Sequence, residues 1–130
     1  MDEAVKKAKR ILFVEDDRDL IDVVTVRLRV AGYEVTACHD GESALKEVKR
    51  QRPDLLVLDV FLPVIDGYSV LRAVKEHLQK TEGKDDMPVI IITGRGSLMK
   101  DMFKLEGVRE FLQKPFEAER LVELAKQFVG

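Results

Sequence analysis

Four short, mostly apolar runs in this sequence each end in side chains that can take part in chemistry. Glu15 and Asp16 follow the run Ile-Leu-Phe-Val, and Asp59 follows Leu-Leu-Val-Leu. Thr93 follows Val-Ile-Ile-Ile, and Lys114 follows Phe-Leu-Gln. Such apolar runs are typical of strands that are buried on both faces in a parallel sheet. Because ligands of these sheets bind just beyond the carboxyl ends of the strands, all five residues are candidates for one site.

Each of these residues alone has an ordinary explanation. An acid after a strand can cap the next helix, threonine is common in strands, and a lysine at a strand end is usually solvated. An acid pair, an aspartate, a threonine and a lysine at the ends of four strands are a more specific pattern. The combination therefore indicates a function that none of the residues indicates by itself.

The pattern suits a metal ion and a phosphoryl group. Three carboxylates brought together without a basic partner would raise one another's pKa values, and a divalent cation would relieve that repulsion. Carboxylate oxygens and water are ligands that suit Mg²⁺ or Mn²⁺. If Asp59 were phosphorylated, the metal and Lys114 would neutralise the phosphoryl charge, and Thr93 would donate a hydrogen bond to an oxygen. Gly94 would leave room beside the group.

Helical periodicity separates the apolar runs, and the alternation of strands and helices predicts an α/β fold. Right-handed crossovers then give a flavodoxin-like (βα)5 doubly wound parallel sheet of strand order 2-1-3-4-5. In that order strands one and three are neighbours, which places Glu15 and Asp16 beside Asp59. We expect strands at 11–14, 33–38, 55–58, 89–92 and 111–113, helices at 18–31 and around 44–48, 70–78, 98–106 and 121–128, and an exposed loop at 79–87.

Length and composition limit the class of protein. A chain of 130 residues is one domain, which we place at residues 10–130 after a charged N-terminal extension at 1–9. The net charge of −2 gives no electrostatic basis for direct nucleic-acid binding. Cys38 is the single cysteine, so no internal disulfide is possible. With no membrane-length apolar run and no signal-peptide core, we expect a cytoplasmic protein that does not bind membranes.

The motifs Ile-Leu-Phe-Val-Glu-Asp-Asp, Leu-Asp-Val-Phe-Leu-Pro-Val-Ile-Asp-Gly, Ile-Ile-Thr-Gly and Lys-Pro-Phe are together highly specific. Through them the chain resembles the receiver domain of two-component response regulators, the CheY-like fold, over essentially residues 10–129. The resemblance implies that Asp59 accepts a phosphoryl group from a phosphohistidine of a histidine kinase or phosphotransfer protein. It also implies that the chain is not an enzyme in the usual sense, since it would catalyse only its own phosphorylation and dephosphorylation.

The resemblance also assigns roles around the metal. Asp16 and Asp59 would bind Mg²⁺ directly, Glu15 would act through water, and the backbone carbonyl of Phe61 would complete the protein ligands. No other cofactor is implied.

The remaining implied roles concern the phosphoryl group and its consequences. Thr93 and Lys114 would bind phosphoryl oxygens, and Phe111 matches a switch aromatic whose rotamer is coupled to Thr93. We also expect a cis bond between Lys114 and Pro115, which aims the lysine inward. Phosphorylation would change a face that binds a downstream protein or an output domain outside this chain, with the protein a monomer or a weak phosphorylation-dependent dimer.

Phe61 has a second predicted role. The side chain two residues after Asp59 overlooks the path of the water that hydrolyses an acyl phosphate. We expect the bulky, apolar Phe61 to exclude that water, with Arg95 facing it, unless the ring simply packs against a neighbouring loop.

Three other functions remain as alternatives. A haloacid-dehalogenase-type phosphatase also uses a strand-end aspartate, but it needs a second aspartate two residues later, where this chain has Phe61. A flavin-binding module needs a hydroxyl- and glycine-rich phosphate loop after strand one, where Glu15 and Asp16 would repel phosphate. A degenerate receiver that signals without phosphorylation would have lost a site residue, and none is missing.

Overall fold

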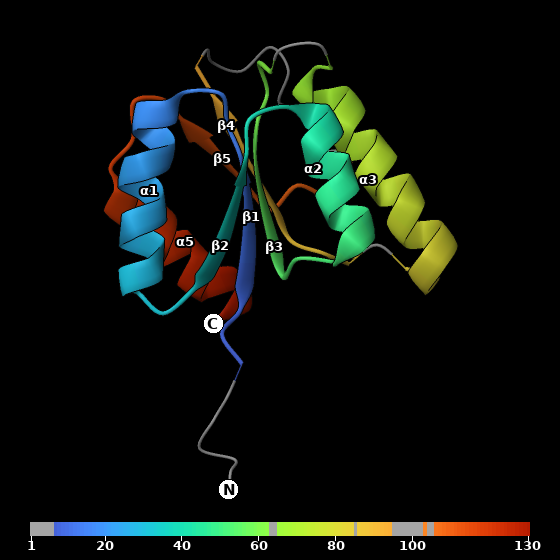
Figure 1. Ribbon diagram of the computed structural model, residues 1–130, viewed down its shortest axis with the longest axis horizontal. Coiled ribbons are helices and arrows are strands. Elements are labelled where there is room, and N and C mark those ends of the chain that lie inside the picture. The colour runs from blue at the N-terminus through green and yellow to red at the C-terminus, as the bar shows by residue number, and fades with distance from the viewer. Residues whose placement is uncertain (1–6, 63–64, 85, 95–102, 104–105) are drawn as a thin grey trace, which may run out of the picture.

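A five-stranded parallel sheet with helices on both faces forms the protein (Figure 1). The computed structural model describes residues 7–62, 65–84, 86–94, 103 and 106–130. The sheet has the order β2-β1-β3-β4-β5, and every neighbouring pair is parallel, which confirms the predicted flavodoxin-like topology. The strands are β1 (Arg10–Val14), β2 (Glu34–Cys38), β3 (Leu55–Asp59), β4 (Val89–Thr93) and β5 (Glu110–Gln113).

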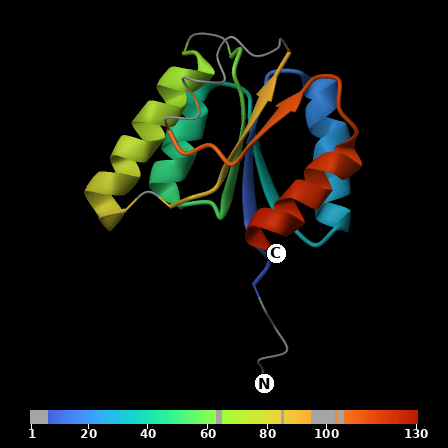
Figure 2. The same ribbon diagram turned by 180° about the vertical axis from the view of Figure 1, so that it is seen from behind.

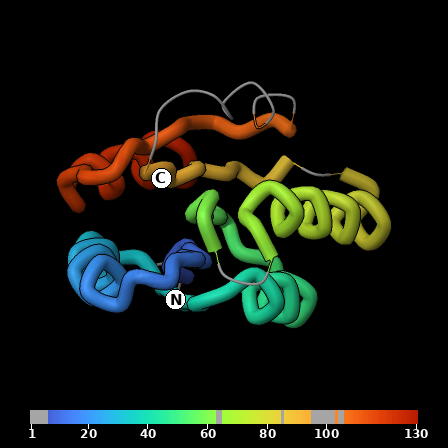
Figure 3. The backbone as a smooth tube through the Cα atoms, turned by 90° about the horizontal axis from the view of Figure 1, so that it is seen from above, coloured from blue at the N-terminus to red at the C-terminus, as the bar shows by residue number. Residues whose placement is uncertain are grey.

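The helices divide between the two faces of the sheet, α1 and α5 on one and α2 and α3 on the other (Figures 1 and 2). A view from above shows the same three layers (Figure 3). The helix expected around 98–106 falls almost entirely outside the described residues. Among the described helices, none is long and apolar enough to cross a membrane. The bounds are α1 (Arg18–Val30), α2 (Gly41–Arg50), α3 (Gly67–Glu82) and α5 (Ala118–Val129).

The two helical layers explain why the strands are continuously apolar. Side chains of a strand alternate between the two faces of a sheet. In β3, Leu55 and Val57 pack on the side of α1 and α5, whereas Leu56 and Leu58 pack on the side of α2 and α3. All five residues of β3 are buried, so its last residue, Asp59, is brought into the interior at the carboxyl edge of the sheet.

Three aspartates at the same edge of the sheet begin the helices that follow the first three strands. Asp17 accepts a hydrogen bond from the backbone N–H of Leu20 (3.2 Å) at the start of α1. Asp40 and Asp66 do the same for α2 and α3, at 2.8 and 2.9 Å. Because these side chains satisfy backbone donors that a helix start leaves free, they fix where each helix begins.

The predicted loop at 79–87 is wrong in its first half. Helix α3 continues to Glu82, and Gly83 ends it in the left-handed conformation, with φ of 73°. Residues 79–82 are polar, which suggested a loop, but their side chains are tolerated on the exposed side of a helix. An ion pair between Glu76 and Lys80, one turn apart at 3.0 Å, supports the extension.

Candidate functional site

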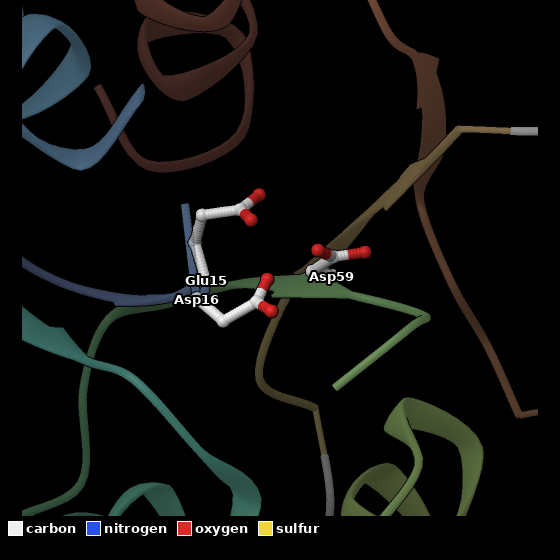
Figure 4. A group of neighbouring side chains, drawn as sticks. All are labelled: Glu15, Asp16 and Asp59. Carbon is white, nitrogen blue, oxygen red and sulfur yellow. The ribbon is translucent and has the colours of Figure 1, made fainter. Parts of the chain in front are cut away.

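Three carboxylates meet at the carboxyl ends of β1 and β3, as predicted from the strand order. One oxygen each from Glu15, Asp16 and Asp59 lies within 4.8 Å of the others (Figure 4). Glu15 is fully buried and Asp59 is 3% exposed, whereas Asp16 is exposed. The cluster is therefore deep on one side and open to solvent on the other, so that an ion could enter past Asp16.

Lys114 gives this cluster a basic partner, which the expectation of three unpaired acids did not include. Its Nζ lies 2.8 Å from Oε1 of Glu15 and 3.2 Å from Oδ2 of Asp59. The backbone N–H of Lys114 donates to the carbonyl of Thr93 (2.8 Å), and the Lys114–Pro115 bond is cis, as predicted. The ammonium group thus lies between two of the three acids, and no described ion pair joins it to Asp16.

The buried acid and the lysine change each other's pKa values. Burial raises the pKa of Glu15 to about 7, against the opposing effect of its hydrogen bond with Lys114, while nearby Asp59 adds to the rise. Burial alone would lower the pKa of Lys114, but the hydrogen bond to Glu15 and the charge of Asp59 outweigh it and raise that pKa. The metal-free site therefore depends on this lysine for its charge balance.

One oxygen of Glu15 has no hydrogen bond. Its Oε2 accepts from Nζ of Lys114 (3.0 Å) and from the backbone N–H of Asp17 (3.1 Å). Its Oε1 is buried and lies close to the same ammonium group, but that contact lacks the geometry of a hydrogen bond. A buried polar atom without a hydrogen bond is rare, and such an atom commonly contacts a water molecule or an ion. The oxygen-rich donor set therefore fits a hard divalent cation.

Asp17 has a different role from the two acids before it. Its side chain caps α1 instead of joining the cluster, while its backbone N–H donates to Glu15. The sequence shows three consecutive acids, and only the structure separates the two that meet Asp59 from the one that starts the helix.

Thr93 and Phe111 belong to β4 and β5, on the side of Asp59 that faces away from Glu15 and Asp16. Thr93 is buried at the end of β4, and its neighbour Ile92 pairs with Asp59 across the sheet. Phe111 is half-buried against the core on the side of α2 and α3, with its ring 6.4 Å from that of Phe103. Their roles as phosphoryl ligand and switch aromatic stay predictions.

The loop after β3 also contacts the Asp59 carboxylate, through a backbone hydrogen bond. The backbone N–H of Phe61 donates to Oδ1 of Asp59 (3.0 Å), and the side chain of Phe61 is 53% exposed. The N–H of Gly67 donates to the carbonyl of Val60 (2.9 Å), which ties the start of α3 to this loop. A Cβ on Gly67 would lie only 2.5 Å from the backbone oxygen of Asp59. Only glycine allows this close approach.

We predict that Gly67→Ala lowers the free energy of unfolding by about 1–3 kcal/mol, because the added methyl group meets backbone that has little room to move. Urea denaturation measures this change. Gly94→Ala is the matched control, since a Cβ there meets no atom within 4 Å in the described part of the chain. Equal losses in the two variants would contradict a steric role for Gly67.

Fold and site together define a class of protein: a doubly wound α/β domain with an acidic cluster and a lysine at the switch point of its strand order. Residues 11–126 match the model of the response regulator receiver domain family. The chain belongs to this family and is a receiver domain.

Individual relatives agree with this assignment. The chain is 39% identical to the response regulator MprA of Mycobacterium leprae over 114 residues, which are 87% of this chain and 47% of MprA. The chain thus spans about half the length of the curated relatives it matches.

Solved receiver structures also resemble this one. Chemotaxis protein CheY4 of Vibrio cholerae is 29% identical with a TM-score of 0.84, over 95% of this chain and 100% of that one. The receiver domain of the sensor histidine kinase PA1611 of Pseudomonas aeruginosa PAO1 is 32% identical with a TM-score of 0.79, over 95% and 99% of the two chains. The PA1611 structure has a magnesium ion coordinated in its active site cleft.

Proposed function

We propose that Asp59 is the phosphoacceptor of this receiver domain and that its donor is a phosphohistidine of a histidine kinase or phosphotransfer protein. The observation that carries the proposal is the position of Asp59, buried at the switch point between a carboxylate cluster and the ammonium group of Lys114. A group that gains negative charge there has a cation already within 3.2 Å.

The same geometry supports a divalent cation as cofactor, Mg²⁺ or Mn²⁺. We infer that Asp16 and Asp59 bind it directly, that Glu15 acts through water, and that the carbonyl of Phe61 is a further ligand. Support comes from the three converging carboxylates, the orphaned oxygen of Glu15, and the magnesium-bound receiver of PA1611. When bound, the cation neutralises charge on the phosphoryl oxygens.

In the transfer step a carboxylate oxygen of Asp59 attacks phosphorus, and the phosphorus–nitrogen bond of the donor breaks. Its electron pair returns to the imidazole nitrogen. Lys114 would exchange its contacts with Glu15 and Asp59 for the phosphoryl oxygens, and Thr93 would donate a hydrogen bond to another of them. Phe111 lies on β5, which pairs with the strand of Thr93. Its rotamer would change together with Thr93 and so alter the face that binds the downstream protein.

The proposal extends to the setting of the domain. We place the receiver domain at residues 10–130 and treat 1–9 as an extension before it. A downstream protein or an output domain reads the response, in the cytoplasm. The receiver itself acts as a monomer or a weak phosphorylation-dependent dimer. Direct nucleic-acid binding by this domain is not expected, given its net charge of −2.

The test is to incubate the protein with acetyl phosphate and Mg²⁺ and to measure the intact mass. One phosphoryl adduct is expected in the wild type and none in Asp59→Asn. Asp17→Asn is the matched control, because asparagine still caps α1 and Asp17 lies outside the carboxylate cluster. An adduct that persists in Asp59→Asn, or one that does not require a divalent cation, would contradict the proposal.

We predict that Phe61→Asn speeds the loss of the phosphoryl group several-fold. Hydrolysis needs a water in line with phosphorus, and the half-exposed Phe61 ring, two residues after Asp59, offers that water no hydrogen bond. Asparagine would hold the water. The measurement is the decay of the phosphorylated mass after the donor is removed.

Phe61→Leu is the control for this prediction, since it stays apolar and should keep a slow decay. Equal decay rates in Phe61→Asn and the wild type would show that Phe61 does not shield the site. Arg95, which we expect to face Phe61, lies outside the described residues.

A further inference from the structure

Strand β2 forms one edge of the sheet, and a hollow of about 480 Å³ lies between it and α1. In Figure 1 β2 lies between α1 and α2 at the front of the molecule. The lining comes from α1, from β2 and from the residue that follows β2. The lining residues are Arg18, Ile21, Asp22, Thr25, Val26, Arg29, Ala37 and His39.

Some backbone N–H and C=O groups of β2 point away from β1, toward the open edge of the sheet. The N–H of Glu34 and the carbonyl of Cys38 bond toward the β1 side, to Lys9 and Glu15. Because successive residues of a strand alternate, the N–H and C=O groups of Val35 and Ala37 point away from β1. Arg29 donates to the outward carbonyl of Val35 at 3.0 Å. The groups of Ala37 face the open edge.

Two side chains of β2 lie on the side of the sheet where the hollow is found. Val35 and Ala37 pack on the α1 side of the sheet. If a further strand paired with β2, alternate side chains of that strand would therefore lie under α1, in the hollow. The hollow has the position and the volume that such side chains need.

Charge at the hollow indicates which side chains these would be. Arg18 and Arg29 lie at its two ends, eleven residues or about 16 Å apart along α1. Two side chains on one face of a strand, four residues apart, are about 14 Å apart. Asp22 is the one carboxylate among the lining residues. The two guanidinium groups thus match a strand with acidic residues at both ends of one face.

We propose that the β2 edge binds an extended, acidic peptide segment of a partner protein by strand addition, with its acidic side chains at Arg18 and Arg29. This interaction uses neither Asp59 nor the metal ligands, so it is separate from the phosphoryl chemistry. The segment would run antiparallel to β2, with a small residue between the two acids directly opposite Ala37. That residue would exchange both backbone hydrogen bonds with Ala37, and its side chain would lie near Thr25. Such edge pairing is a general mode of peptide recognition.

The probe is the blocked peptide acetyl-Glu-Val-Ser-Val-Glu-amide, titrated into the full chain labelled with ¹⁵N. Amide shifts are expected on β2 and the adjoining side of α1. A peptide with proline in place of serine lacks the central N–H and should lose most of the binding. A peptide with lysine in place of both glutamates should not bind.

Variants of the full chain test the charge match. Arg18→Gln should weaken the first peptide about fivefold, the largest effect usual for one exposed ion pair. Arg27→Gln on the same helix is the control, because Arg27 pairs with Glu119 of α5, away from the hollow. Asp22→Asn should tighten binding, which gives a second and opposite readout.

Several results would overturn the proposal. Amide shifts confined to the carboxylate cluster would place the peptide at the phosphoacceptor site. Equal binding of the serine and proline peptides would show simple charge attraction without strand pairing. Pairing of two copies through β2, seen as peptide-independent dimerisation, would show that the edge serves self-association instead.

Discussion

Asp16→Ala is expected to weaken Mg²⁺ binding at least tenfold and to stabilise the metal-free protein by about 1 kcal/mol. Both effects follow from the position of Asp16 in the carboxylate cluster, where Lys114 contacts the other two acids but makes no described ion pair with Asp16. Without metal, this carboxylate only repels its neighbours. In the proposed metal-bound site, it would be the exposed ligand that completes the set.

Thermal melts with and without Mg²⁺ measure both effects, because a ligand that binds only the folded protein raises its stability. Asp17→Asn is the control, since its cap is retained and its metal response should equal that of the wild type. The same metal-induced stabilisation in Asp16→Ala and the wild type would contradict a metal site at these residues.

Lys114→Met should have the opposite effect to Asp16→Ala on the stability of the metal-free protein, and should lower it by about 3 kcal/mol at pH 8. Removing one partner of a buried ion pair usually costs about 3–5 kcal/mol, and we take the lower end because Lys114 is partly exposed. Glu15 is fully buried, and at pH 8 it would either carry its charge without a counter-ion or take up a proton, and both cost stability. Methionine retains most of the apolar side chain, so that lost packing contributes little.

The loss in Lys114→Met should shrink as the pH falls. The pKa of Glu15 is about 7 in the folded protein, above its ordinary value of 4.5, so folding favours the protonated acid and stability declines as pH rises between these values. Removal of Lys114, which lowers that pKa, would raise it further. At pH 5.5 the variant can keep Glu15 neutral, whereas at pH 8 the unpaired charge is costly.

Urea denaturation of the wild type and the variant at both pH values provides the measurement. Lys114→Arg is the control that keeps a positive charge and should lose less stability at pH 8. A difference between wild type and Lys114→Met that does not change with pH would show that Glu15 is not the group left uncompensated.

Much of the fold could be predicted from the sequence for a clear physical reason. Strands covered by helices on both faces must be apolar throughout, so the runs that end at Asp59 and Thr93 could be recognised without any contact being known. Polar residues at the ends of such runs must emerge at one edge of a parallel sheet. The strand order followed from the right-handed crossovers of a doubly wound sheet, and with it the meeting of Glu15, Asp16 and Asp59.

Other features depend on contacts between residues that are far apart in the chain, which no local sequence pattern reveals. Lys114 lies 99 residues from Glu15 in the chain, and its contact with that acid exists because β1 and β5 end at the same edge of the sheet. Glycine at position 67 is required by the backbone of Asp59, which approaches it only after α3 docks. The hollow beside β2 is lined by residues of α1 and of the edge strand that come together only when the chain folds. Sequence periodicity determined which residues face the core and which strand ends carry chemistry, whereas tertiary packing decided which of those charges touch.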